Sequence, residues 1–154
     1  MTAEPEKRLL ASNRRARHDY HILERFEAGL VLQGTEVKAA RTGKVQLKDG
    51  YVEIRDGEAF LVGVHIGPYV HGNRENHDPE RPRKLLLKRR EIDRLYGKTQ
   101  TKGLTIVPLS IYLKKNLVKT EIALVQGKKL YDKRRAKREQ ELDREAQAAL
   151  GRRG

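Results

Sequence analysis

The sequence has 154 residues, a formal net charge of +13 and no cysteine, and 36% of its residues are charged against 37% hydrophobic. The lack of cysteine excludes disulfides, thiolate metal sites and cysteine nucleophiles, and no apolar run approaches the roughly 20 residues that span a membrane. A positive charge of this size favours a polyanionic partner such as nucleic acid, because solubility alone is reached with far less charge.

The N-terminal residues 1–12 are polar and are predicted to be flexible. Charged residues stand where a secretory signal has its apolar stretch, so we expect an intracellular protein, in a bacterial cell a cytoplasmic one. From His18 to Leu32, apolar residues alternate with polar or small ones. This pattern predicts half-buried strands, with a bend or bulge at Gly29.

The stretch 34–41, GTEVKAAR, is predicted to be a short helix that Thr35 caps and Gly43 ends. Its notable residue is Glu36. In a strongly basic protein, a carboxylate commonly serves as the counter-charge of an arginine. The alternative is recognition of an RNA base, because a carboxylate accepts a hydrogen bond from an amino group and repels phosphate.

Two Asp-Gly pairs lie between alternating apolar runs, at 48–50 and at 55–57. An Asp-Gly pair in this setting is the strongest short-range signal for a β-hairpin. The segment 45–66 is therefore predicted to contain three short strands.

Residues 67–82 are rich in Gly, Pro and Asn and are predicted to form a loop, long enough to indicate function or mobility. A basic amphipathic helix is predicted to follow at 83–96. Its N-terminus would combine free N–H groups with the cations Arg81, Arg83 and Lys84, a favourable arrangement for binding phosphate.

Two long strands are predicted at 104–115 and 117–128, joined near Lys115 and Asn116. Pro108 lacks the backbone donor of a sheet ladder, so its strand is predicted to lie at an edge or to be bulged there. The first strand is predicted to carry one shared face made of Val107, Leu109, Ile111 and Leu113. Together these elements predict a mainly β fold, a small antiparallel barrel of about six strands with two or three helices.

The C-terminal stretch 127–154 carries ten Lys or Arg against five Asp or Glu, and residues 1–126 carry 24 against 16. Its few apolar residues cannot offset the entropy of ordering, so we predict a tail that is disordered when free. Pairs four residues apart, such as Arg135 with Glu139, support a helix once a partner holds it, and Tyr131 is a candidate for stacking on an RNA base. The alternative is an inert, solvated tail.

The sequence contains none of the common catalytic motifs. A phosphate-binding glycine loop, a G-x-S-x-G elbow and an H-E-x-x-H pair are all missing. The five histidines are interpreted as scattered surface residues rather than as metal ligands. No catalytic residue, metal site or cofactor is predicted.

Long phrases in the chain resemble a known family. They are NRRARHDYHILERFEAGLVLQGTEVKAARTGKV, DGEAFLVGVHI, DPERPRKLLLKRREIDRLYGK and GKKLYDKR, in this order and spread over about Ser12 to Arg138. Together they are similar to small protein B, the bacterial SsrA-binding protein family.

The resemblance implies an OB-like barrel and a role as an RNA-binding adaptor of trans-translation, not an enzyme. Members of the family bind the transfer-RNA-like domain of transfer-messenger RNA (SsrA RNA) and deliver it to stalled ribosomes for rescue and peptide tagging. The implied partners are this RNA, the decoding region of the small ribosomal subunit and, through the RNA complex, elongation factor Tu. We further expect a monomer with three parts: a flexible N-terminus (1–12), an RNA-binding barrel (13–126) and a tail that is helical on the ribosome (127–154).

The resemblance also implies roles for individual residues. The expected RNA-binding residues are Asn13, Arg14, Arg15, Glu36, Lys38, Arg83 and Lys84. The expected ribosome-contacting residues of the tail are Gly127, Lys128, Lys129, Tyr131, Asp132, Lys133 and Arg134. Residues beyond Arg138 depart from the family's pattern, and no role is carried over to them.

Two other functions stay open on the residues alone. A ribosomal protein or a general RNA chaperone could have a similar barrel and charge. An RNA-processing hydrolase is a remote alternative, because the sequence offers neither clustered carboxylates nor a paired nucleophile.

Overall fold

The computed structural model of the chain describes residues 7–70, 76–128, 140, 142 and 144. These residues form nine strands and three helices. In chain order they are β1 (Lys7–Ser12), α1 (Arg14–Asp19), β2 (Tyr20–Leu30), α2 (Gly34–Arg41), β3 (Val45–Gln46), β4 (Tyr51–Arg55), β5 (Glu58–Val62), β6 (His65–Ile66), β7 (Arg83–Leu86), α3 (Arg89–Thr99), β8 (Leu104–Lys114) and β9 (Leu117–Gly127).

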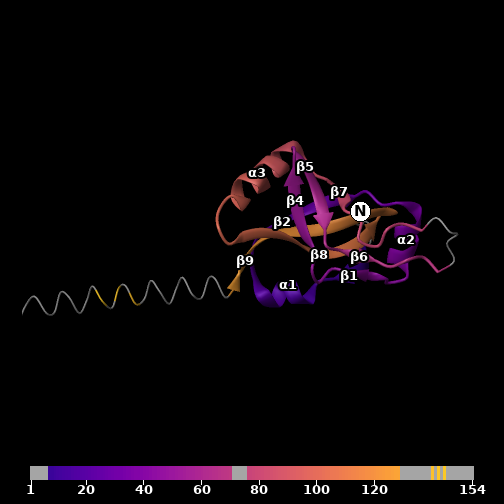
Figure 1. The fold of residues 1–154 in the computed structure, drawn as a ribbon, viewed down its shortest axis with the longest axis horizontal. Coiled ribbons are helices and arrows are strands. Elements are labelled where there is room, and N and C mark those ends of the chain that lie inside the picture. The colour runs from indigo at the N-terminus through magenta and orange to yellow at the C-terminus, as the bar shows by residue number, and fades with distance from the viewer. Residues whose placement is uncertain (1–6, 71–75, 129–139, 141, 143, 145–154) are drawn as a thin grey trace, which may run out of the picture.

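Seven strands form one antiparallel sheet in the order β1-β8-β9-β2-β7-β5-β4, while β3 and β6 form a separate pair. The sheet curls so that β4, at one edge, also lies against β8 (Figure 1). The main core fills the interior of this curl, with Leu61, Leu85 and Ile122 fully or almost fully buried. The predicted mainly β, antiparallel fold with helices is confirmed.

Two hairpins have the turns that the sequence predicts. Lys115 and Asn116 join β8 to β9 with φ of 50° and 62°, and Asp56 and Gly57 join β4 to β5 with φ of 51° and 78°. Two successive residues at positive φ match the right-handed twist of the flanking strands. The hairpin predicted at 48–50 is wrong, because β3 pairs with β6 and not with β4.

Strand β8 is bulged next to Pro108. The pairing with β9 shifts between Pro108 and Ser110, which leaves Leu109 as an extra residue. The bulge moves the strand's side chains from one face to the other: Leu109 packs into a small second core with Ala16, whereas Ile111 lies in the main core. The predicted bulge is confirmed, and the single shared face predicted from 107 to 113 is wrong.

Three local predictions near the N-terminus are corrected. Residues 7–12 form β1, which pairs with β8, instead of a flexible segment. His18 lies in helix α1 and not in a strand. The bulge of β2 lies between Ile22 and Glu24, while Gly29 allows β7 to approach closely: a Cβ at Gly29 would lie 3.2 Å from the Cβ of Leu86.

The helix predicted at 83–96 is a strand followed by a shorter helix. Arg83 and Leu85 are buried and Lys84 and Leu86 are exposed, a period of two that belongs to a strand. Strand β7 inserts between β2 and β5, and α3 begins at Arg89. Between β6 and β7, the described residues 67–70 and 76–82 form the predicted loop, without helix or strand. Within the described residues, no helix combines the length and the apolar character that crossing a membrane requires.

Candidate nucleic-acid interface

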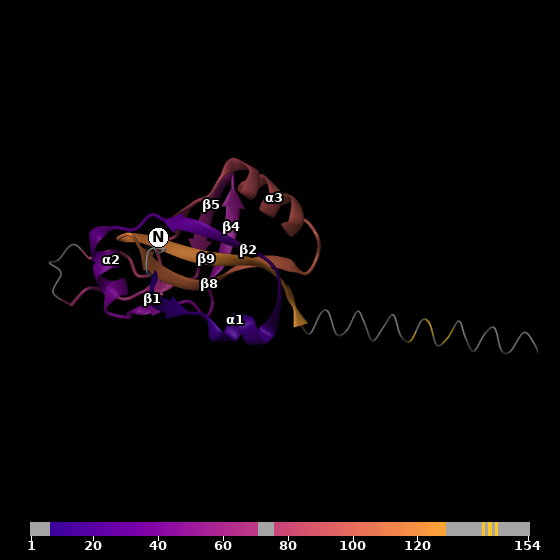
Figure 2. The same cartoon turned by 180° about the vertical axis from the view of Figure 1, so that it is seen from behind.

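The residues predicted to bind RNA gather at two ends of the molecule (Figures 1 and 2). We call the part formed by α2 and residues 76–86 the α2 end. We call the part formed by α1, the start of β2 and the end of β9 the α1 end. The two ends are built in different ways.

The α2 end is organised around the carboxylate of Glu36, which is fully buried. One oxygen accepts hydrogen bonds from Arg81 and from the backbone N–H of Gln33 (2.8 Å), and the other accepts from Nε of Arg83 (2.6 Å). Burial by itself raises the pKa of Glu36, but the hydrogen bonds from Arg81, Gln33 and Arg83 outweigh it and lower the pKa from its ordinary value. Glu36 is therefore an ionised counter-charge, the first of its two interpretations, and it is not exposed to read a base.

Arg83 is also fully buried. Besides Glu36, its guanidinium donates to the carbonyl oxygens of Val64 (2.6 Å) and Pro79 (3.0 Å). The prediction of a phosphate site at a helix N-terminus is wrong. Arg83 lies in a strand, and its guanidinium donates to buried protein acceptors. Burial alternates from Arg83 to Leu86, but the residue types Arg-Lys-Leu-Leu do not alternate, so the sequence carries no strand signal here.

A second set of contacts ties α2 to the loop before β7. His77 is buried, and its ring nitrogens lie 2.8 Å from Oγ1 of Thr35 and 2.8 Å from the carbonyl oxygen of Ile66. His77 is thus a structural residue rather than a surface histidine. The prediction that Thr35 caps α2 is wrong: the hydroxyl of Thr35 contacts His77, and Gln33 and Glu36 cap the helix.

Two predicted RNA-binding residues of the α2 end are exposed. Lys38 lies with its Nζ 5.6 Å from the ring centre of Tyr69. Lys84 extends from β7 toward Glu58, with Nζ and Oε1 3.3 Å apart. Both ammonium groups are accessible to a phosphate backbone, and the buried cluster below fixes the elements that carry them. The Tyr69 contact joins residues 31 apart and has no signal in the sequence.

The α1 end is held by Asn13, which is buried at 3% exposure. Its Oδ1 accepts from the backbone N–H of Ala16 (3.1 Å), and its Nδ2 donates to the carbonyl oxygens of Pro108 (2.9 Å) and Leu47 (3.3 Å). Asn13 therefore caps α1 and fastens it to the barrel. The role of Asn13 in RNA binding stays a prediction, and its burial favours an indirect role through the position of α1.

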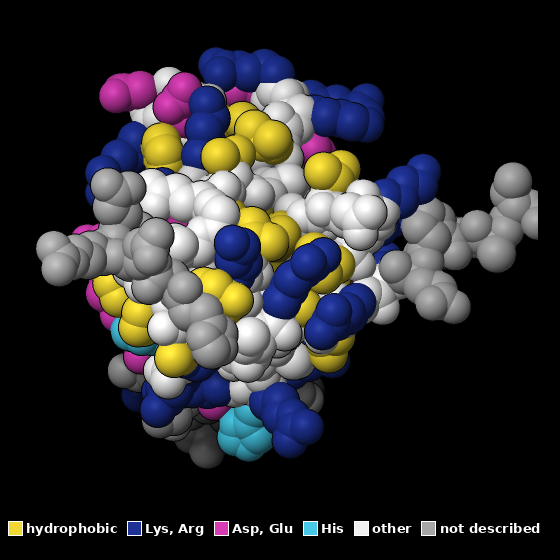
Figure 3. All heavy atoms as spheres, turned by 90° about the vertical axis from the view of Figure 1, so that its right-hand side faces the viewer, with side chains coloured by type: hydrophobic (Ala, Val, Ile, Leu, Met, Phe, Trp, Pro, Cys, Tyr) yellow, Lys and Arg dark blue, Asp and Glu magenta, His cyan; other side chains and the backbone are white. Residues whose placement is uncertain are grey.

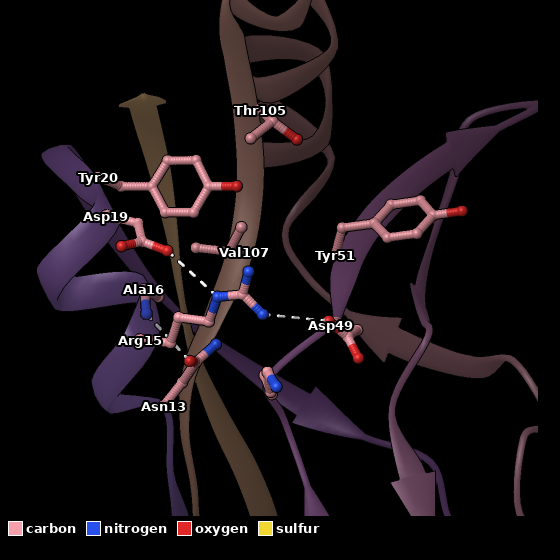
Figure 4. A pocket seen from close by; sticks show the side chains of 11 residues that line it. Asn13, Arg15, Ala16, Asp19, Tyr20, Asp49, Tyr51, Thr105 and Val107 are labelled. Carbon is pink, nitrogen blue, oxygen red and sulfur yellow. Dashed lines mark hydrogen bonds and ion pairs between the residues drawn. The ribbon is translucent and has the colours of Figure 1, made fainter. Parts of the chain in front are cut away.

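The next two predicted residues face outward. Arg14 is exposed. Arg15 lies in a cleft, where its guanidinium is 3.2 Å from Asp19 of the same helix and 3.6 Å from Asp49 on the other side (Figure 4). Hydrogen bonds from His18 and Arg15 lower the pKa of Asp19, so this carboxylate stays ionised. The cleft has a volume of about 360 Å³, and its lining includes Tyr20 and Tyr51 in addition to these residues.

The C-terminal tail starts at the α1 end. Gly127, the last residue of β9, is paired with Tyr20 at the start of β2, and Lys128 follows it. The other predicted tail residues, Lys129, Tyr131, Asp132, Lys133 and Arg134, lie outside the described residues. On the side of the molecule that carries α2, opposite the side on which β9 runs out, Lys and Arg side chains stand among hydrophobic ones (Figure 3). In the described part of the chain, no three side chains of His, Asp or Glu are grouped so that they could hold a metal ion.

Comparison with known proteins identifies relatives over almost the whole chain. The sequence model of the family described as SmpB protein matches residues 10–152. The SsrA-binding protein of Carboxydothermus hydrogenoformans is 54% identical over 144 residues, which are 94% of this chain and 97% of that protein. The SsrA-binding protein of Acidothermus cellulolyticus is 54% identical over 153 residues, 99% of this chain and 96% of that protein.

A solved structure has the same fold. It comes from the work described as "tmRNA-SmpB: a journey to the center of the bacterial ribosome", with 50% sequence identity and a TM-score of 0.66. The match covers 77% of this chain and 83% of the solved one. Sequence and fold therefore point to the same relatives.

Proposed function

This chain belongs to the SmpB family, and we propose that it is the RNA-binding adaptor that takes transfer-messenger RNA (SsrA RNA) to stalled bacterial ribosomes. The observation that carries the proposal is the identity of 54% with SsrA-binding proteins over nearly the full length. The net charge of +13, divided between barrel and tail, supports a polyanionic partner. The protein acts in the cytoplasm, as a monomer and without catalysis of its own, and it meets elongation factor Tu through the RNA.

The structure supports two kinds of contribution by the predicted RNA-binding residues. Arg14, Lys38 and Lys84 are exposed cations that can contact phosphates directly, and Arg15 is an exposed cation held by Asp19 and Asp49. Asn13, Glu36 and Arg83 are buried and act indirectly, by fixing the elements that carry the cations. The tail from Gly127 onward contacts the decoding region of the ribosome after the RNA is bound.

The experiment that tests the adaptor function is competition binding of the purified full chain. We expect tight binding of SsrA RNA that weakens steeply between about 50 and 200 mM salt, and much weaker binding of unrelated folded RNAs of equal length. Equal affinity for all RNAs would contradict the adaptor function and favour a general RNA chaperone.

A truncation separates barrel and tail. A chain that ends at Gly127 keeps the exposed cations of the barrel, so we expect nearly unchanged affinity for SsrA RNA. The same chain should fail to support peptide tagging on ribosomes stalled on an mRNA without a stop codon. Loss of SsrA RNA binding on truncation would refute this division.

A further inference from the structure

The cleft at the α1 end is built differently from a phosphate site. It lies between α1, the start of β4 and strand β8, and its volume of about 360 Å³ falls in the range of about 300–1,000 Å³ that is usual for small-ligand sites. The guanidinium of Arg15 crosses it between two carboxylates, Asp19 and Asp49 (Figure 4). These two negative charges offset Arg15 and the neighbouring Lys48, so the interior carries little net charge and does not favour an anion.

The walls of the cleft suit a flat ring. Ala16 and Val107, both almost fully buried, are apolar lining residues, and Tyr20 is half-buried with its ring extended toward β8 (Figure 4). The Arg15 guanidinium is planar and is held from two sides by its carboxylates. Aromatic rings and guanidinium planes are the two groups on which proteins stack unpaired RNA bases.

The rim of the cleft suits the backbone of an RNA strand. Arg14 and Arg17 are exposed on α1 beside it. The chain leaves β9 at Gly127, which is paired with Tyr20 of the cleft. A neutral, stacking interior with a cationic rim is the arrangement expected for a nucleotide whose base is inserted and whose phosphates stay outside.

We propose that this cleft binds one unpaired RNA base, stacked against Tyr20 and the Arg15 guanidinium. The inference rests on the proposed function, because it names the nucleotide that one surface of an RNA adaptor takes. Asp49, with 80% of its side chain exposed, accepts a hydrogen bond from an exocyclic amino group, and Thr105 provides a hydroxyl. The cleft therefore prefers adenine, cytosine or guanine to uracil, whose exocyclic groups are acceptors.

The direct test uses the full chain and six-nucleotide RNAs made only of adenosine or only of uridine. We expect the adenosine RNA to bind more tightly and to shift the backbone amide NMR signals of Ala16, Tyr20 and Thr105. In Asp49→Ala, the preference for adenosine over uridine should be lost. Signals that shift elsewhere and not around the cleft would overturn the inference.

Two matched pairs of variants test the stacking groups. Tyr20→Leu keeps an apolar side chain and should weaken binding of the adenosine RNA by about 5- to 100-fold. Tyr96→Leu, at an exposed position of α3, should leave this binding unchanged. Arg15→Lys keeps the charge and should weaken binding of the adenosine RNA by about 2- to 5-fold. The control is Arg25→Lys, because Arg25 is equally exposed (56% against 55%) and also ion-paired. Because Tyr20 packs on the second core, Arg15→Lys decides the question if Tyr20→Leu does not fold; no difference between Arg15→Lys and Arg25→Lys would overturn the inference.

Two RNAs could supply the base, and separate measurements distinguish them. Binding of Arg15→Lys is compared with wild type for SsrA RNA alone and for the SsrA RNA complex on 70S ribosomes. A defect with SsrA RNA alone assigns the base to that RNA, and a defect only on ribosomes assigns it to ribosomal RNA. If wild type binds SsrA RNA and all cleft variants match it in both, the inference fails and the adaptor function stands. If wild type does not bind SsrA RNA but binds the adenosine RNA in the cleft, the inference stands and the adaptor function fails.

Discussion

Helices α1 and α2 are each fixed to the barrel by one buried polar side chain, and the two side chains differ in charge. Asn13 is neutral and is satisfied by backbone groups of residues 16, 47 and 108. Glu36 is ionised and requires two arginines, Arg81 and Arg83, from a segment about 45 residues away. Loss of Glu36 therefore leaves a buried charge without compensation, whereas loss of Asn13 leaves only neutral carbonyl groups with one donor fewer. The two ends should differ in how much stability one substitution removes.

The largest effect is expected for Glu36→Gln. Removal of one partner of a buried ion pair commonly lowers the free energy of unfolding by about 3–5 kcal/mol, and here Arg83 would stay buried without its counter-charge. Urea unfolding measures the change. Glu53→Gln is the matched control: Glu53 forms a two-point contact with Arg55 (2.8 Å for each bond), but in an exposed pair, so little change is expected. Equal effects of the two substitutions would refute the special role of the buried cluster.

The next largest effect is expected for Asn13→Ala. It removes the cap of α1, worth about 1 kcal/mol, and the buried donor to the carbonyl of Pro108, whose loss costs about 1–3 kcal/mol. The carbonyl of Leu47 keeps its hydrogen bond from the backbone N–H of Gly50 (2.8 Å). We expect a loss of about 2 kcal/mol in the same urea experiment. Asn13→Ser can restore the cap but cannot reach both carbonyls, so its stability should lie between wild type and Asn13→Ala. If serine restores full stability, the cap alone fixes α1.

These two side chains also mark the limit of what the sequence predicts. The hairpins at Asp56-Gly57 and Lys115-Asn116 and helix α2 follow from neighbouring residues, because turn geometry and helix caps are local. The sequence predicts a helix where β7 lies, because a charged residue such as Arg83 is not expected at a buried position of a strand. That placement is stable only with Glu36 47 residues away, and no local pattern contains such a partner.

The same limit applies to the candidate site. Residue type and family resemblance indicate Asn13, Glu36 and Arg83, but all three are buried, and we therefore propose that they position other residues. The cleft was not predicted, because Arg15, Asp49 and Thr105 come from three separate elements that only the folded barrel brings together.

A smaller effect should appear as a difference in acid stability. The folded-state pKa of Glu36 is lowered, so its contribution is complete above the ordinary value of 4.5 and is lost as the pH falls through the folded pKa. A hydrogen bond from Tyr112 also lowers the pKa of Glu27, and the two groups act in the same direction. Urea midpoints between pH 7 and pH 3 should fall for wild type and fall less for Glu36→Gln. Asn13→Ala keeps both carboxylates, and its curve should run parallel to that of wild type; a flattened curve for Asn13→Ala would contradict the assignment to Glu36.

The smallest effects on stability, and the sharpest comparison of the two ends, are expected from single exposed cations. Lys38→Ala at the α2 end and Arg14→Ala at the α1 end should each change the free energy of unfolding by less than about 0.5 kcal/mol. If each cation contacts a phosphate of SsrA RNA, its loss should lower the slope of log affinity against log salt by about 0.7–0.9. Lys98→Ala, in the last turn of α3 and part of neither end as defined above, is the control. A lower slope for Lys38→Ala alone would assign SsrA RNA to the α2 end and leave the α1 end to the ribosome. A lower slope for both would mean that one RNA contacts both ends of the barrel. The salt slope reports lost phosphate contacts, so it separates them from an effect on the fold, which the unfolding experiment measures.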